Sequence, residues 1–116
     1  MIGKISVLAA VLLIPTQALS APKLLNGEAI ADLLPKIIAL GEQTRQTFSA
    51  AGATTYTDRG RDTYGSWRVQ GDKYCSQWPP ADGWACYGVE YDASTARLVW
   101  IDGGGDRTVN SVKPKH

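Results

Sequence analysis

The sequence predicts a mainly β protein of the α+β class. A short N-terminal helix is followed by an antiparallel meander that forms a small barrel or a strongly curved sheet. Turn-forming residues recur roughly every eight to twelve positions from Gly41 onward, which is typical of such meanders. Apolar and polar residues alternate through residues 64–87, as on half-buried strands. The same stretch holds both cysteines, Cys75 and Cys86, whose bridge would join two neighbouring strands.

Residues 1–20 are predicted to be a signal peptide. Lys4 gives a positive start, an apolar run follows, and the small residues of Ala18-Leu19-Ser20 mark a cleavage site. The run of about ten apolar residues is too short to span a bilayer, which needs about twenty. We therefore expect residues 21–116 to be a single domain without a membrane anchor, periplasmic or secreted.

Charge and cysteine usage exclude several classes of partner. The chain has 12 basic and 11 acidic residues, so loss of Lys4 would balance them. A neutral domain is a poor ligand for nucleic acid or an anionic membrane surface. An exported chain favours a Cys75–Cys86 disulfide over free thiols. Zinc would need about four ligands, and the only histidine is the terminal His116. We expect no metal and no cofactor.

The helix is expected to begin after Asn26, whose side chain can cap it. One apolar stripe at helical spacing follows, formed by Ala29, Ile30, Leu33 and Leu34. Pro35 disfavours a helical residue before it, so we place the end of the helix near Leu34. Residues 36–40 are then either a first strand or a kinked continuation, and the strand is the favoured interpretation.

The rest of the chain is expected to be strands and turns. Residues 43–49 alternate without a strong apolar face, as an edge strand would. The other expected strands outside the central stretch are residues 54–57, 98–102 and 107–112. The expected turns are residues 51–53, 58–62 and 103–106, and residues 113–116 form a polar tail.

The central stretch predicts a strand register. Gly71-Asp72 suits a two-residue hairpin, which sets Val69 opposite Tyr74. A disulfide that pairs Cys75 with Cys86 independently sets Tyr74 opposite Tyr87. Both registers bury the same apolar set, whereas a slip of one residue would turn Tyr74 to the wrong side. The inner face would then hold Trp67, Val69, Tyr74, Ser76, Ala85, Tyr87, Val89 and Tyr91. The outer face would hold Arg68, Cys75, Cys86, Gly88 and Glu90.

No catalytic residue is identified. Nucleophilic catalysis needs a base beside the nucleophile, and the one histidine is terminal while the cysteines are expected to be oxidised. Asp58 and Asp62 bracket two arginines and are interpreted as a solvated charged turn. Residues 103–106 resemble a phosphate loop only in their glycines, because the following Lys-Ser/Thr is missing. A hairpin turn explains them.

The loop from Gln77 to Trp84 is the candidate recognition site. Trp84 is expected on the outer face with the disulfide, and Trp78 at a strand end. Prolines and the bridge would hold both indoles in place at little ordering cost, which suits protein or glycan recognition. Arg68 adds an anion or carbonyl contact, unless it pairs with Glu90. Alternatively, the tryptophans cap the open end of a barrel and shield the disulfide.

Three segments resemble a known pattern: Gly65-Ser66-Trp67-Arg68-Val69, then residues 74–80 (Tyr-Cys-Ser-Gln-Trp-Pro-Pro), then Cys86-Tyr87. The pattern is similar to that of a family of small exported bacterial proteins, mainly proteobacterial, known as domains of unknown function. The resemblance implies a periplasmic or secreted β domain, and it carries no catalytic residue that could be transferred.

We interpret the chain as a non-enzymatic envelope or secreted domain that binds another protein or a cell-wall glycan. The alternative is an inhibitor of a hydrolase such as lysozyme, which would present the loop from Trp78 to Trp84 to an active-site cleft. A small enzyme that uses carboxylates alone is the third hypothesis.

Overall fold

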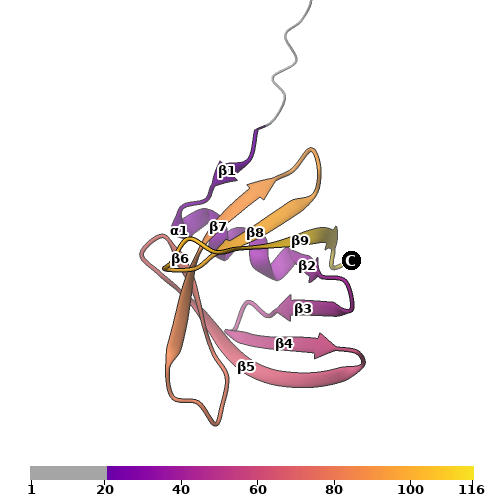
Figure 1. Cartoon of the computed structure of the whole chain (residues 1–116), viewed down its shortest axis with the longest axis vertical. Coiled ribbons are helices and arrows are strands. Elements are labelled where there is room, and N and C mark those ends of the chain that lie inside the picture. Colours follow the sequence, from indigo (N-terminus) through magenta and orange to yellow (C-terminus); the bar gives the residue numbers. More distant parts are fainter. Residues whose placement is uncertain (1–20) are drawn as a thin grey trace, which may run out of the picture.

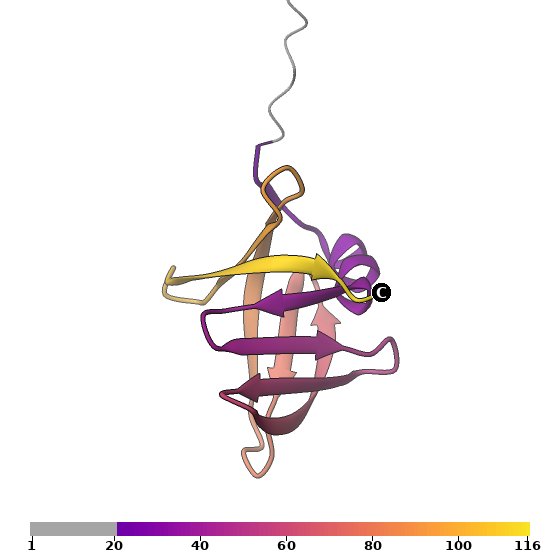
Figure 2. The same ribbon diagram turned by 90° about the vertical axis from the view of Figure 1, so that its right-hand side faces the viewer.

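Eight antiparallel strands close into a barrel in the computed structural model, which describes residues 21–116 (Figures 1 and 2). The predicted signal peptide lies in residues 1–20, outside the described residues. The barrel strands are β2 (Ile37–Leu40), β3 (Thr44–Phe48), β4 (Ala53–Asp58), β5 (Arg61–Gln70), β6 (Lys73–Gln77), β7 (Trp84–Asp92), β8 (Arg97–Ile101) and β9 (Arg107–Pro114). A further two-residue strand, β1 (Lys23–Leu24), pairs with the C-terminal half of β7.

The barrel is a meander closed by its first and last strands. Each strand from β2 to β9 pairs with the next, and β9 returns to pair with β2, where Ile37 lies opposite Pro114 and Leu40 opposite Ser111. The predicted fold class is therefore confirmed, and of its two forms the closed barrel is the one found. Closure leaves the eight barrel strands without a free edge.

The predicted helix is also confirmed. Helix α1 (Gly27–Leu33) begins after Asn26, whose Oδ1 accepts a hydrogen bond from the Ala29 backbone N–H at 2.9 Å. A 3-10 turn, η1 (Leu34–Lys36), contains Pro35 and leads directly into β2, so residues 37–40 are a strand and not a kinked helix. Ile30 and Leu34 are fully buried, because the helix covers one end of the barrel (Figure 2).

The N-terminus of α1 rests on the β5–β6 turn. The Gly27 N–H donates to the Asp72 carboxylate at 2.8 Å, an arrangement that places an acidic group at the positive end of the helix. A Cβ atom at residue 27 would lie 2.2 Å from the Gly71 carbonyl oxygen, so only glycine allows this close approach. The turn therefore fixes the position of the helix as well as the register of two strands.

The register predicted for the central stretch is confirmed at both hairpins. Val69 pairs with Tyr74, Cys75 with Cys86, and Tyr74 with Tyr87. Gly71 has a φ of +60°, as the two-residue turn requires. The predicted inner face is buried or half-buried except for Ala85, which is exposed near the start of β7.

The core is an aromatic cluster centred on Phe48. Its ring makes edge-to-face contacts with Trp67, Tyr74 and Trp100, with centroids 5.6–6.0 Å apart. The Trp67 indole N–H donates to the Ser49 carbonyl at 2.9 Å, so its one polar atom is satisfied.

Three expectations about the strands are wrong. Residues 43–49 are not an edge strand, because β3 pairs on both sides and turns Gln46 and Phe48 inward. The turn expected at residues 58–62 is shorter, since Arg59 and Gly60 alone lie between β4 and β5 and both have positive φ. The expected tail at residues 113–116 begins within β9, whose pairing with β2 extends to Pro114.

The predicted disulfide joins Cys75 on β6 to Cys86 on β7, and the two cysteines are 11 residues apart in sequence. Replacing both cysteines by alanine should lower the free energy of unfolding by ~2.5–3 kcal/mol, because the bridge restricts the unfolded chain. Urea denaturation of the two proteins measures the difference. Reductant should lower the midpoint of the wild type and leave that of the double variant unchanged. An unchanged wild-type midpoint would contradict a structural role.

Candidate functional site

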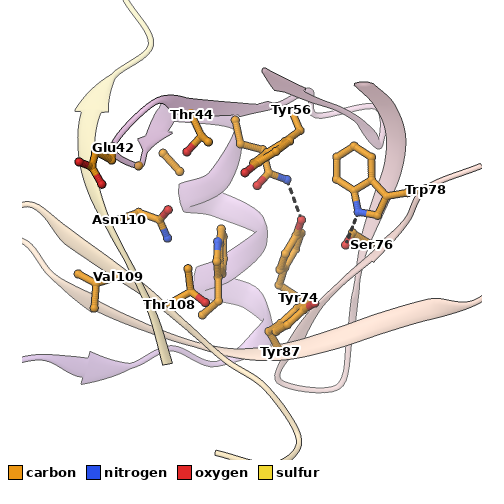
Figure 3. Close-up of a pocket in the computed structure, with 14 residues that line it drawn as sticks. Glu42, Thr44, Tyr56, Tyr74, Ser76, Trp78, Tyr87, Thr108, Val109 and Asn110 are labelled. Carbon is orange, nitrogen blue, oxygen red and sulfur yellow. Dashed lines mark hydrogen bonds between the residues drawn. The ribbon is translucent and has the colours of Figure 1, made fainter. Parts of the chain in front are cut away.

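The barrel is hollow at the end away from α1. Figure 3 shows the view into this cavity, with the helix behind it. The cavity has a volume of about 590 Å³. Its lining comes from every barrel strand except β5, and from the turns that follow β2 and β6. The lining residues are Ala39, Gly41, Glu42, Thr44, Gln46, Tyr56, Tyr74, Ser76, Trp78, Tyr87, Trp100, Thr108, Val109 and Asn110.

Aromatic rings form one side of the cavity. The Tyr74 ring stacks with that of Trp100, with centroids 4.5 Å apart, and with that of Tyr87, with centroids 6.0 Å apart. Elsewhere on the wall, the Tyr56 and Trp78 rings meet edge to face, with centroids 6.2 Å apart. These rings give the cavity an aromatic surface, and aromatic groups attract one another both in offset stacks and edge to face.

A glycine on β5 makes room for the Trp78 indole. A Cβ atom at residue 65 would lie 2.7 Å from the Trp78 ring and 2.5 Å from the Gln77 carbonyl oxygen. The indole N–H donates to the Ser76 hydroxyl at 3.1 Å, which fixes the orientation of the ring. Trp78 is thus held as part of the cavity wall.

A hydrogen-bonded amide lies behind the rings. The buried Gln46 donates through Nε2 to the Thr54 hydroxyl at 3.0 Å and to the Tyr74 hydroxyl at 2.9 Å. Thr54 donates its own proton to the Thr47 carbonyl at 2.8 Å, so it can only accept from Gln46. This sets the orientation of the amide and leaves its Oε1 as a free acceptor. No buried polar atom of the described side chains lacks a partner, so Oε1 must be open to the cavity.

The opposite side of the cavity is polar. Asn110 donates through Nδ2 to the Leu98 carbonyl at 3.3 Å, and Thr44 and Thr108 lie near it (Figure 3). Glu42, in the exposed turn between β2 and β3, is the one charged residue of the lining.

Burial sets the ionisation of the central tyrosine. Desolvation raises the pKa of Tyr74 above its ordinary value of 10.0, although the hydrogen bonds from Ser76 and Gln46 lower it in part. The hydroxyl therefore keeps its proton at neutral pH, and it serves the cavity as a neutral polar group.

The structure separates the residues of the predicted recognition site. Trp78 points into the cavity, whereas Trp84 lies on the outer face of the wall, opposite the outward-facing Gln77. The Arg68 guanidinium carbon is 3.9 Å from the centroid of the Trp84 ring, a cation–π contact. Arg68 does not pair with Glu90, which instead forms an ion pair with Arg107. The loop therefore presents one indole on each side of the wall.

Most of the cavity is not evident from the sequence. The sequence places Tyr74 and Tyr87 on the inner face as core residues, but their rings also form the cavity wall. The alternation on β4 could have placed Tyr56 inside, since Thr54 and Tyr56 face the same way. Gln46 and Asn110 gave no signal, because a polar residue in a strand ordinarily indicates the solvent-facing side.

Comparisons of the chain with protein-family models, curated proteins and solved structures found no match. Within residues 21–116, no helix is long and apolar enough to cross a bilayer. The same residues contain no group of three or more His, Cys, Asp or Glu side chains that could hold a metal ion.

Replacing Gly65 by alanine should displace the Trp78 indole and lower the free energy of unfolding by about 1–3 kcal/mol, because the added methyl group overlaps the ring. A shift in tryptophan emission and a lower urea midpoint are the expected results. Gly83→Ala is the matched control, since a Cβ atom there meets nothing within 4 Å. Equal behaviour of the two variants would show that the close approach at residue 65 is unimportant.

The raised pKa of Tyr74 predicts a loss of stability in alkali. Because the folded pKa lies above the unfolded one, the contribution is complete below about pH 10 and is lost as the pH rises through the folded pKa. Urea denaturation at pH 8 and pH 11 should show a larger loss for the wild type than for Tyr74→Phe, which has no proton to release. A loss of equal size in both proteins would contradict the assignment.

Proposed function

We propose that this chain is a non-enzymatic binding protein that holds one small organic molecule in the open end of its barrel. The observation that carries the proposal is the cavity of about 590 Å³, whose wall combines five aromatic rings with a few fixed polar groups. Ligand sites in proteins commonly have volumes of about 300–1,000 Å³ and this kind of lining. Barrels of eight strands are also wide enough to enclose one small ligand.

The preformed wall supports binding as the role of the cavity. Trp78 is oriented by Ser76 and Gly65, Tyr74 stacks with two other rings, and Gln46 is held by two hydrogen bonds. Side chains that are already ordered lose little conformational entropy when a ligand arrives, so more of the contact energy remains as affinity.

The composition of the lining supports a non-enzymatic role. It contains no histidine, cysteine or lysine, and Glu42 is its single carboxylate. Acid–base catalysis usually needs a group whose pKa is tuned toward the working pH, and the pKa of the buried Tyr74 moves away from neutrality.

The location proposed for the protein is the periplasm or the cell exterior. The Cys75–Cys86 bridge supports it, because structural disulfides persist in oxidising compartments. The predicted signal peptide in residues 1–20 supports it independently. The protein would then meet its ligand in the periplasm or outside the cell.

A second candidate function uses the outer face. Trp84 and Arg68 form a contact pair that lies on the outer side of the wall, and tryptophan and arginine are enriched at the energetic centres of protein interfaces. This pair would serve a protein partner or a cell-wall glycan, including a hydrolase such as lysozyme. It would do so without Trp78, which belongs to the cavity.

Titration with N-phenyl-1-naphthylamine, an aromatic probe whose fluorescence rises in apolar sites, tests the main proposal. The oxidised chain should bind it, and Trp78→Ala should weaken binding about two- to tenfold, since an aromatic contact is worth about 0.5–1.5 kcal/mol. Trp84→Ala is the matched control from the same loop and should bind as the wild type does.

A blocking variant gives an independent test. Thr108→Trp adds an indole at the mouth of the cavity and should abolish probe binding, whereas Ser111→Trp adds the same group on the outer face of β9 and should not. Equal binding by all four variants would overturn the cavity as the site. If Trp84→Ala instead loses a protein or glycan partner, the outer-face function is supported.

A further inference from the structure

We infer that the ligand of the cavity is an arylalkylamine, that is, a planar aromatic ring joined through a short alkyl chain to a protonated amino group. This inference rests on the proposed function and deepens it by naming the ligand class. It follows from the division of the cavity into an aromatic side and a polar side, and from the negative charge or negative partial charge that both sides carry.

The two sides of the cavity are shown in Figure 3. The rings of Tyr56, Trp78 and Tyr87 lie on one side, while Glu42 and Asn110 lie on the other. A ligand that uses both sides therefore has an apolar planar part and a polar head. The volume of about 590 Å³ leaves room for a ring and a short chain that carries this head across the mouth.

Two amide oxygens of the lining are acceptors, one behind the rings and one on the polar side. Gln46 uses its amide nitrogen for two hydrogen bonds within the wall, so its Oε1 is the atom left for a ligand. Asn110 also donates into the wall through its amide nitrogen, and its Oδ1 accepts no hydrogen bond from the described residues. A head group that donates hydrogen bonds can pair with such an oxygen, whereas a head group with acceptors alone can pair with neither.

The charge of the lining selects a cation among such donors. Glu42 is its only charged residue, with no basic side chain among the lining residues to balance it. The faces of the aromatic rings are also negative and attract cations. A carboxylate or phosphate head would meet a carboxylate, two amide oxygens and the ring faces. An ammonium group is attracted by all of them.

Three probes that share one ring and differ in charge test the inference: tryptamine (cationic), indole (neutral) and indole-3-acetate (anionic). Isothermal titration calorimetry at pH 7 on the oxidised chain should give about tenfold tighter binding of tryptamine than of indole-3-acetate, with indole between them. The ratio combines a cation–π contact and an exposed ion pair, each worth up to about 1 kcal/mol.

Glu42→Gln identifies the source of the preference. It should weaken tryptamine binding about two- to fivefold, because an exposed ion pair is lost, and so reduce the ratio of tryptamine to indole-3-acetate affinity. Glu28→Gln is the matched control, because Glu28 is an exposed glutamate on α1 outside the cavity lining. It should leave the ratio unchanged. Added salt should also weaken tryptamine binding more than indole binding.

The outcomes separate this inference from the proposed function. If indole binds and Trp78→Ala weakens it, but the amine is no tighter than the acid, the cavity is a binding site and the amine inference is overturned. The inference is likewise overturned if N-phenyl-1-naphthylamine binds and tryptamine does not. If neither the three probes nor N-phenyl-1-naphthylamine bind, the proposed function fails together with it.

Discussion

The pairing of β9 with β2 is the constraint on which the rest of the structure depends. It joins residues far apart in sequence, such as Ile37 and Pro114, and converts a meander into a closed wall. A closed wall of eight strands has an interior wide enough to be filled by side chains or to hold one small ligand. Helix α1 fills one end with Ile30 and Leu34, which have no exposed surface. Among the described residues no element covers the other end, and the cavity lies there.

The period of two along each strand then assigns every side chain to one side of the wall. Trp67 and Arg68 are neighbours in sequence, yet one lies in the core and the other contacts Trp84 outside. The disulfide occupies the outer face at the position where Tyr74 and Tyr87 occupy the inner face. The wall therefore separates the disulfide from the cavity, because the bridge fixes the strand pair without taking up interior volume.

The register of residues 64–87 could be predicted because two local signals fixed it independently. The Gly71-Asp72 turn set one hairpin and the cysteine pair set the other, and neither depends on distant residues. The closing pairs could not be predicted, since the short β2 has no signal that specifies β9 as its partner. Residues 43–49 look like an edge strand in the sequence because Gln46, although polar, faces inward and interrupts the apolar alternation. The prolines that follow Trp78 place it at a strand end, whereas the alternation extended from Ser76 places it inside.

The cavity itself has no positive signature in the sequence, because it consists of side-chain volume that is missing. Large apolar groups fill the helix end of the interior, where Ile30 and Leu34 are fully buried. The open end instead has small or polar inner residues, among them Ala39, Ser76 and Asn110, beside rings that larger aliphatic groups could have covered. Filling that space would bury more apolar surface and stabilise the barrel. Gln46 lies inside with its amide nitrogen hydrogen-bonded and its amide oxygen unpaired. A polar group that is only partly paired does not stabilise a core. The uncovered rings and open acceptors make this end of the barrel less stable than a filled core would be. Departures of this kind concentrate at functional sites. The open end thus lacks the large apolar side chains that fill the helix end of the same barrel, and this difference favours a ligand there.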